Sequence, residues 1–417
     1  MRSARTRSVL FGSTLMLCAG TLAVAVAPAS AVPVSRASVD PGSGPDYEMP
    51  FLCGQTWTGT KRPYHSQSVN AIDWNAPNDE GTPIVAAAPG VVSKVDPTGT
   101  SGYGHYAIID HGNGQSTLYA HMKLTWLVAG MPIDQSQPIG FLGGTGNVTG
   151  PHLHFEERLN SSDFAPYFHR TRFRMNTSQV STNCPDSPIA GDWNGDGKTD
   201  VGVFHRSASG ASWDQLAGTK TTSVRSFGTG WDQVFVGDWN GDKKTDVGVR
   251  PPGNPKFVLR AANGALTKIT YGSILAVPVS GDWNGDGTAE IGVWRPDLHR
   301  FAERSASGQT TYVTFGATGD QPVTGDWNGD GKTDVGVYRP STRSFLLRTV
   351  SSTGAVTTTT VPLGASGDLP VVGDWNGDKI WDVGVWSPSK AVFTLRYVAQ
   401  GSRTAVFKTV AYGARRG

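Results

Sequence analysis

The stretch GDWNGDGKTDVGV at residues 191–203 decides the fold of the second half of this chain. Close copies begin at Gly237, Gly281, Gly325 and Gly373, so that successive copies stand 46, 44, 44 and 48 residues apart. A repeat of about 45 residues is the size of one four-stranded propeller blade. We therefore predict a β-propeller-like domain of about five blades over residues 185–417.

The composition predicts an all-β protein throughout. The 417 residues include 53 Gly and 26 Pro, and only 17% are charged. Short runs of strand-forming residues, cut by Gly, Pro, Asn and Asp, take the place of any helical period. Before the repeats, at residues 49–184, we expect strands at 83–87, 90–95, 105–110, 115–121 and 152–158.

The first 31 residues have the pattern of a signal peptide. Arg2, Arg5 and Arg7 precede an apolar run, and Ala29-Ser30-Ala31 offers a cleavage site. We expect a secreted protein, associated with the cell wall or released, with no membrane contact after cleavage; an uncleaved anchor is the alternative. Residues 32–48 are rich in Pro, Ser and Gly and resemble a linker. Loss of three arginines takes the formal net charge from +2 to −1, which offers no basic surface for nucleic acid.

Two cysteines remain in the mature chain, Cys53 and Cys184. An even pair in an exported protein is a disulfide candidate, and two buried thiols are the alternative.

Histidines concentrate in residues 49–184, which hold seven of the nine. In the motif GPHLHFE at residues 150–156, His152 and His154 stand two apart, so a strand places both on one face. One can ligate a metal while the other reaches a metal-bound water. A His, an Asp and a second His suit Zn²⁺ with one open position, and His65 and Asp73 are upstream candidates. A general base is also needed, and His121 and His152 are the spare histidines.

Residues from about 50 to 167 resemble the lysostaphin-type (LytM) zinc peptidase family. The matching stretches are GTPIVAA (81–87), APGVV (88–92), DHGNG (110–114), YAH (119–121), IGFLG (139–143) and TGPHLHFE (149–156). The resemblance implies a mostly antiparallel β domain, zinc held by His65, Asp73 and His154, and catalysis by His121 and His152. It also implies endopeptidase activity on peptidoglycan stems or cross-bridges. Many family members have the first His four residues before the Asp, where this chain has Val69.

The alternatives are a catalytically degenerate relative that binds the wall or activates other wall enzymes, and a protease that acts outside the wall. The roles of five further side chains remain open. His111 is expected to be structural and His105 to line the groove. Glu156 is either a residue that orients His154 or a plain strand acid, and Tyr64 or Tyr103 is a candidate oxyanion donor.

Each repeat opens with Asp-Trp-Asn-Gly-Asp and has an acid at position 9. Oxygen ligands at positions 1, 3 and 5 resemble the first half of an EF-hand loop, which predicts structural Ca²⁺. The candidate calcium ligands are Asp192, Asn194, Asp196, Asp200, Asp238, Asn240, Asp242, Asp246, Asp282, Asn284, Asp286, Glu290, Asp326, Asn328, Asp330, Asp334, Asp374, Asn376, Asp378 and Asp382. The alternative is a set of metal-free turns capped by Asp and Asn.

Position 6 of the loop is glycine in the first, third and fourth repeats. Lys243 and Lys379 occupy it in the second and fifth, where we expect weaker calcium binding. The units resemble FG-GAP/VCBS-type repeats, which implies a targeting domain with a glycan or wall ligand. The repeated tryptophan, Trp193 in the first unit, is either a glycan platform or, as we expect, packing between blades.

Overall fold

The computed structural model describes residues 44–61, 68–399 and 401–413, and these form 33 strands. Within these ranges there is no helix, hence none that could cross a membrane. The all-β prediction is confirmed. The predicted signal peptide, residues 1–31, lies outside the described residues.

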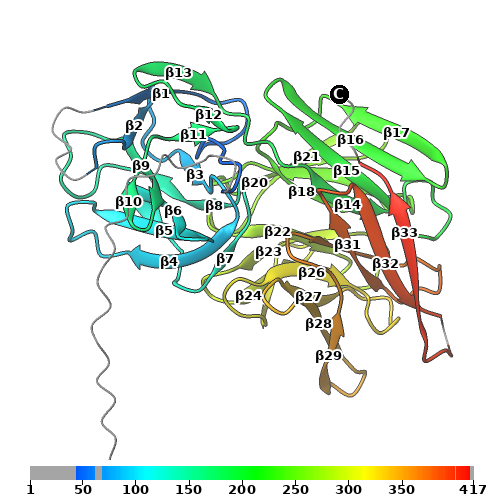
Figure 1. The fold of residues 1–417 in the computed structure, drawn as a ribbon. Helices are drawn as coiled ribbons and strands as arrows, with labels where there is room; N and C mark the ends of the chain where they lie inside the picture. Colours follow the sequence, from blue (N-terminus) through cyan, green and yellow to red (C-terminus); the bar gives the residue numbers. More distant parts are fainter. Residues whose placement is uncertain (1–43, 62–67, 400, 414–417) are drawn as a thin grey trace, which may run out of the picture. The chain divides into compact units, whose positions relative to one another are not determined.

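An 11-stranded antiparallel sheet forms the first part (Figure 1). Its main path runs β13-β1-β2-β9-β6-β5-β4-β7; β10 pairs with β9, and β8 pairs with β3 and β6. The strands are β1 (Thr56–Thr60), β2 (Ile72–Asn75), β3 (Pro83–Val85), β4 (Gly90–Asp96), β5 (His105–Gly112), β6 (Gln115–Thr125), β7 (Pro132–Ile133), β8 (Pro138–Leu142), β9 (Leu153–Leu159), β10 (Ser162–Asp163) and β13 (Thr177–Val180). A separate hairpin pairs β11 (Tyr167–Phe168) with β12 (Thr171–Arg172).

Alternation along β9 explains where the core of this sheet lies. Leu153 and Phe155 are fully buried and join Trp57 and Trp74 in one apolar cluster. Because side chains alternate along a strand, His154 is directed to the opposite face of the sheet. Burial of Leu153 and Phe155 in the apolar core therefore fixes the orientation of β9, the strand that carries His154.

Five four-stranded antiparallel sheets follow, one for each repeat (Figure 1, green to red). The first two consist of β14 (Ser187–Gly191), β15 (Asp200–Ser207), β16 (Gly210–Ala217) and β17 (Lys220–Arg225), then β18 (Gln233–Gly237), β19 (Asp246–Arg250), β20 (Lys256–Arg260) and β21 (Leu266–Thr270). The third consists of β22 (Val277–Gly281), β23 (Glu290–Arg295), β24 (Arg300–Arg304) and β25 (Thr310–Thr314). The last two are β26 (Gln321–Gly325), β27 (Asp334–Arg339), β28 (Ser344–Val350) and β29 (Val356–Pro362), then β30 (Leu369–Gly373), β31 (Asp382–Ser387), β32 (Val392–Val398) and β33 (Ala405–Ala411).

The glycine and tryptophan of the repeat motif are packing residues. A Cβ on Gly325 would lie 2.7 Å from the ring of Trp327 and 2.8 Å from that of Trp381, so only glycine fits there. Trp327 is itself 8% exposed and clusters with Val383 and Val385 of the next blade. This arrangement agrees with the expected packing between blades and leaves little of that ring for a glycan.

The blades close into a ring through their loops. The backbone N–H at position 8 of each loop donates to the carbonyl of the first Asp in the preceding blade, as from Thr245 to Asp192 at 2.8 Å. The remaining pairs are Ala289 to Asp238, Thr333 to Asp282, Trp381 to Asp326 and Thr199 to Asp374, each at 2.8 Å. The last of these joins the fifth blade to the first, so five blades complete the circle.

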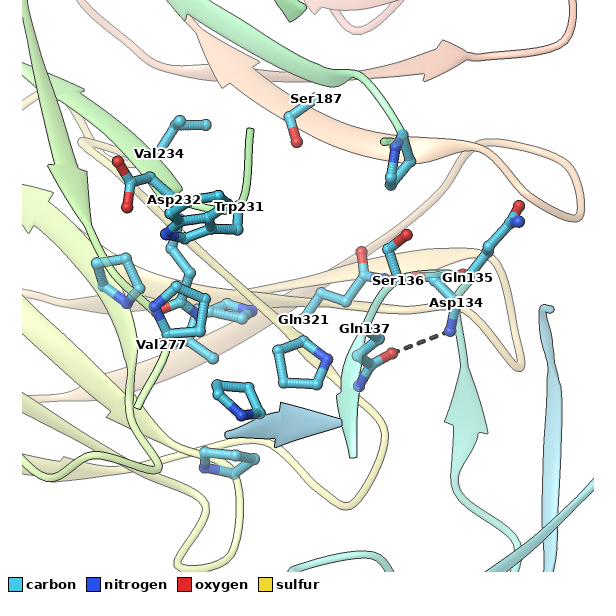
Figure 2. Close-up of a pocket in the computed structure, with 18 of the residues that line it drawn as sticks. Asp134, Gln135, Ser136, Gln137, Ser187, Trp231, Asp232, Val234, Val277 and Gln321 are labelled. Atoms are coloured by element: carbon cyan, nitrogen blue, oxygen red, sulfur yellow. Dashed lines mark hydrogen bonds between the residues drawn. The ribbon is translucent and has the colours of Figure 1, made fainter. Parts of the chain in front are cut away.

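Cys53 and Cys184 form a disulfide, as predicted, across 131 residues. The described residues all belong to one compact unit, and within it a cavity of about 440 Å³ is lined by Trp126, Asp134, Trp231 and Gln321, among others (Figure 2). Gln321 Nε2 donates to Asp134 Oδ2 at 2.7 Å. Among the residues that the structure describes, no histidine lines this cavity, so it is separate from the histidine cluster described next.

Candidate active site

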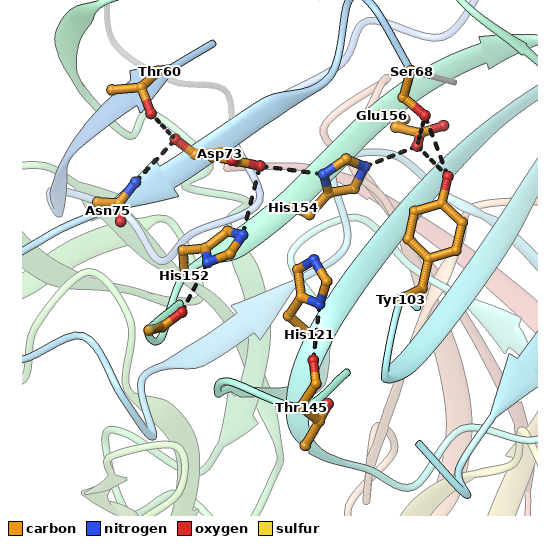
Figure 3. A network of polar contacts seen from close by, with 11 residues as sticks. Thr60, Ser68, Asp73, Asn75, Tyr103, His121, Thr145, His152, His154 and Glu156 are labelled. Atoms are coloured by element: carbon orange, nitrogen blue, oxygen red, sulfur yellow. Dashed lines mark hydrogen bonds and ion pairs between the residues drawn. The ribbon is translucent and has the colours of Figure 1, made fainter. Parts of the chain in front are cut away.

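Three neighbouring strands, β2, β9 and β6, assemble the candidate site (Figure 3). Asp73 on β2 is paired directly with His154 on β9, and His154 is paired on its other side with Ala120 of β6. His121 therefore follows at the next position, and His152 immediately precedes β9. Sheet register thus brings together four of the five residues predicted for zinc binding and catalysis.

The four side chains are buried and close to one another. His154 Nδ1 lies 3.2 Å from Asp73 Oδ1, and His152 Nε2 lies 3.7 Å from the same oxygen. The ring centroid of His121 is 4.8 Å from that of His152 and 5.7 Å from that of His154. None of the four is more than 6% exposed. The four side chains are therefore close enough together to contact the same metal ion or substrate group.

A β-bulge aims His121 into the cluster. His105 pairs with Met122 and Ala107 with Tyr119, so two residues of β6 stand opposite one residue of β5. His121 takes a left-handed φ of 61°, a conformation that is uncommon for a residue other than glycine, and its N–H donates to the carbonyl of Tyr103 at 2.8 Å. The sequence predicted a strand here but not the bulge.

Backbone carbonyls orient both spare histidines. His121 Nδ1 lies 2.9 Å from the carbonyl oxygen of Thr145, and His152 Nδ1 lies 3.0 Å from that of Gly150. A carbonyl only accepts, so Nδ1 carries the hydrogen and Nε2 carries the lone pair in each neutral ring. Burial lowers the pKa of His121 to about 4, so this ring is neutral at pH 7 and able to accept a proton.

Glu156 contacts the cluster through the ring of His154. Its Oε1 accepts hydrogen bonds from His154 Nε2 at 2.8 Å, Ser68 Oγ at 2.7 Å and Tyr103 Oη at 2.9 Å. Arg158 Nε lies 2.8 Å from Oε2. Burial alone would raise the pKa of Glu156, but the bonds from His154 and Ser68 lower it to about 2. The carboxylate is therefore ionised at neutral pH.

Two of these neighbours differ from what the sequence indicated. The hydroxyl of Tyr103, a candidate oxyanion donor, is directed to Glu156 in this structure. Ser68 was not singled out, because a lone serine beside a loop belongs to no motif. Tyr64, the other candidate donor, lies outside the described residues.

Two of the three predicted zinc ligands, Asp73 and His154, are in place. The third, His65, lies outside the described residues. Within the residues that are described, no group of three or more His, Cys, Asp or Glu is arranged to hold a metal. A carboxylate oxygen and an imidazole nitrogen are nevertheless donors that zinc takes, and their buried convergence at 3.2 Å fits such an ion.

The remaining histidines of this part have other contacts. His111 is bonded on both ring nitrogens, Nδ1 to the carbonyl of Pro89 and Nε2 to Thr117 Oγ1, each at 2.8 Å. It is therefore structural, as expected. His105 Nδ1 lies 3.2 Å from the carbonyl of Lys123.

All five repeat loops share one backbone arrangement. In the first, Asp192 Oδ1 accepts the N–H of Gly195 at 2.6 Å and Oδ2 accepts that of Gly197 at 2.8 Å. Lys243 and Lys379 donate in the same way to Asp238 and Asp374, and they take the left-handed φ values of 68° and 71°. Lysine at position 6 therefore leaves the loop geometry unchanged.

The acids at position 9 separate the loops into two groups. Among the described atoms, Oδ2 of Asp200, Asp334 and Asp382 is buried without a hydrogen-bond partner. Burial raises the pKa of these three carboxyls to about 6, 7 and 7 respectively. In the second and third loops the acid is satisfied, since Asp246 accepts the N–H of Trp239 and Glu290 that of Trp283. In the other three loops a bound cation would give the unpartnered Oδ2 atom a partner.

Comparison with known proteins gives the class of the first part. The model of peptidase family M23 matches residues 67–166, which span β2 to β10 and hold Asp73, His121, His152 and His154; the match begins two residues after His65. This part of the chain is therefore an M23 peptidase domain.

The relatives are bacterial proteins. The DD-carboxypeptidase/endopeptidase Mpg of Neisseria meningitidis is 43% identical over 95 residues, 23% of this chain and 21% of that protein. The peptidoglycan DD-endopeptidase ShyC of Vibrio cholerae is 46% identical over 84 residues, 19% of this chain and 18% of that protein. The chain thus spans about a fifth of the length of these curated relatives. Among solved structures, the catalytic domain of the prophage-encoded M23 protein EnpA of Enterococcus faecalis has 28% identity and a TM-score of 0.23, covering 29% of this chain and 91% of that one.

Proposed function

We propose that this protein is an exported zinc endopeptidase that hydrolyses peptide bonds of peptidoglycan stems or cross-bridges. The observation that carries the proposal is the pairing of Asp73 with His154 beside two buried histidines that keep Nε2 as acceptor. The substrate class is supported by relatives that are named as peptidoglycan DD-endopeptidases.

In this proposal Asp73 and His154 hold zinc together with His65. Zinc held there would supply Lewis acidity, which would make a water molecule acidic enough to lose a proton near pH 7. His152 and His121 take up a proton on Nε2 and return it to the leaving amine. The carbonyls of Gly150 and Thr145 hold the two rings in the tautomer that this task needs.

Mature protein, residues 32–417, should release fragments from purified peptidoglycan, with new amino and carboxyl ends on the peptides by mass analysis. Activity should disappear with a zinc chelator and return with added zinc. Peptidoglycan left intact by the zinc-loaded protein would favour the alternative, a degenerate relative that binds the wall or activates other enzymes. The retention of both His121 and His152 supports the enzyme, since a binding protein has no need of them.

We further propose that residues 185–417 form a targeting domain of the FG-GAP/VCBS type that binds calcium. The buried, unpartnered oxygens of Asp200, Asp334 and Asp382 support calcium in those loops. Binding of the isolated wall by the catalytically silent His152→Ala variant, measured by cosedimentation with and without calcium, tests the targeting role.

A further inference from the structure

We propose that Glu156 is a positioning residue that fixes the ring of His154, and that Ser68 and Tyr103 hold Glu156 in place for this task. The inference rests on the proposed zinc site. It concerns side chains that contact the proposed ligand His154 directly or through Glu156, and their effect is measured on zinc binding.

The strand geometry places Glu156 beside the ring. Glu156 follows His154 by two residues on β9, so the two side chains share a face. The 2.8 Å contact joins Oε1 to Nε2 of His154. Because Oε1 already accepts the hydroxyl hydrogens of Ser68 and Tyr103, it is an acceptor for the ring as well, and Nε2 carries the hydrogen. Without a metal, Nδ1 also faces a carboxylate, that of Asp73 at 3.2 Å. In the neutral ring that a metal would bind, the hydrogen on Nε2 leaves the lone pair on Nδ1. Glu156 thereby selects the nitrogen available to a metal.

Two hydroxyl donors and one ion pair keep this carboxylate from turning. Ser68 Oγ and Tyr103 Oη donate to the same Oε1 (Figure 3). Arg158 Nε forms an ion pair with Oε2 at 2.8 Å. Ser68 and Tyr103 also contact each other, with their oxygens 3.2 Å apart. Rotation of Glu156 away from His154 would break the hydrogen bonds from Ser68 and Tyr103 in a site where only 1% of Glu156 is exposed. The ring is therefore held by a network that joins segments 35 and 53 residues apart.

Glu157 provides a matched control within the same strand. It is also 1% exposed, but it is directed to the other face, where both of its oxygens accept the N–H of Tyr167 at 3.0 Å. A general effect of altering a buried glutamate should appear at both positions. An effect on His154 should appear only at Glu156.

The experiment compares Glu156→Leu, Glu156→Gln and Glu157→Gln in the mature full chain, with zinc affinity measured by chelator competition. Ligand-orienting partners are typically worth about 10–100-fold in metal affinity, so Glu156→Leu should weaken zinc binding by that factor. Glu156→Gln keeps an acceptor oxygen and should restore most of the affinity, while Glu157→Gln should match the wild type. Equal affinity in a folded Glu156→Leu variant would overturn the proposal.

Two further measurements test whether Glu156 positions His154 if the Glu156→Leu variant fails to fold. The Ser68→Ala/Tyr103→Phe double variant removes two of the donors to Oε1 and should bind zinc several-fold more weakly; unchanged affinity would overturn the proposal. Nitrogen-15 spectra of the zinc-loaded wild type should show His154 bound through Nδ1 with hydrogen on Nε2, and the reverse pattern would refute it. A wild-type protein that binds no zinc would instead refute the proposed function.

Discussion

The backbone N–H of Thr199 donates to the carbonyl of Asp374 at 2.8 Å and so joins the first blade of the propeller to the fifth. Each blade is built from four consecutive strands, so no strand is shared between the two ends of the ring. Closure depends on this loop contact and on side-chain packing across the same junction. Trp375 supplies much of that packing, because it clusters with Val201 and Val203 of the first blade.

Trp375→Ala should therefore destabilise the propeller. Removal of a buried tryptophan typically costs about 3–5 kcal/mol, which thermal unfolding of the full chain would record as a clearly lower melting temperature. Phe407→Ala is the control, since this ring is 59% exposed on the outer strand β33 and its loss should change little. Equal melting of both variants would show that the junction does not hold the ring.

His121→Ala and His152→Ala should each abolish most peptidoglycan hydrolysis while zinc remains bound. Loss of a general base or acid typically costs about 10²–10⁴-fold in rate. Activity and metal content are measured on the same preparations, with His111→Ala as a histidine control outside the cluster. Wild-type rates in either variant would remove that histidine from the proposed mechanism.

The sequence predicts the blades of the propeller more fully than the geometry of the candidate active site. The repeat period predicts five blades because each unit contains one complete set of four strands. The pairing of Asp73 with His154 depends on register between residues 81 positions apart, which the sequence does not encode locally. The strand pattern also conceals the bulge, because a left-handed φ at His121 leaves no glycine as a marker.

A half-buried glutamate, Glu303, should make the propeller less stable as pH rises. Burial raises the pKa of Glu303, on β24, from 4.5 to about 7. Because the folded pKa is the higher one, the folded state binds more protons between these values, and stability present below about pH 4.5 is lost as pH rises through about 7. Glu303→Gln removes this charge, so its melting temperature should exceed that of the wild type by a few degrees at pH 8 and match it near pH 4.5. Melting curves in chelator test this, and parallel curves for both proteins at all pH values would contradict it.

The disulfide should stabilise the first part of the chain. Closing the loop from Cys53 to Cys184 is worth about 4–5 kcal/mol in the chain-entropy model. The Cys53→Ser/Cys184→Ser double variant should therefore unfold at a lower temperature or denaturant concentration than the oxidised wild type. Reduced wild type is the matched control and should unfold with the variant. If oxidised and reduced protein unfold alike, the unfolded chain gains little conformational entropy when the disulfide is absent.

Calcium should raise the melting temperature of the propeller. The loops gather several carboxylates, whose mutual repulsion opposes the compact turn. An ion that binds only the folded loop stabilises it by about 2.7 kcal/mol at a hundredfold excess over Kd. The full chain should then melt at a higher temperature in calcium than in chelator. Identical melting curves in the two conditions would identify the loops as metal-free turns.

The third and fifth loops decide which feature controls calcium affinity. Glu290 accompanies a glycine at position 6, Gly287, yet both of its oxygens are already bonded, by Trp283 and Asn284. Asp382 accompanies Lys379, yet its Oδ2 is buried without a partner among the described atoms. If the unsatisfied oxygen controls binding, Asp382→Asn should reduce calcium stoichiometry by calorimetry more than Glu290→Gln does. If glycine at position 6 controls it, the order should reverse. The first and fourth loops have both features, a glycine at position 6 and an unpartnered carboxylate oxygen, so Asp200→Asn and Asp334→Asn should each reduce calcium binding under either rule.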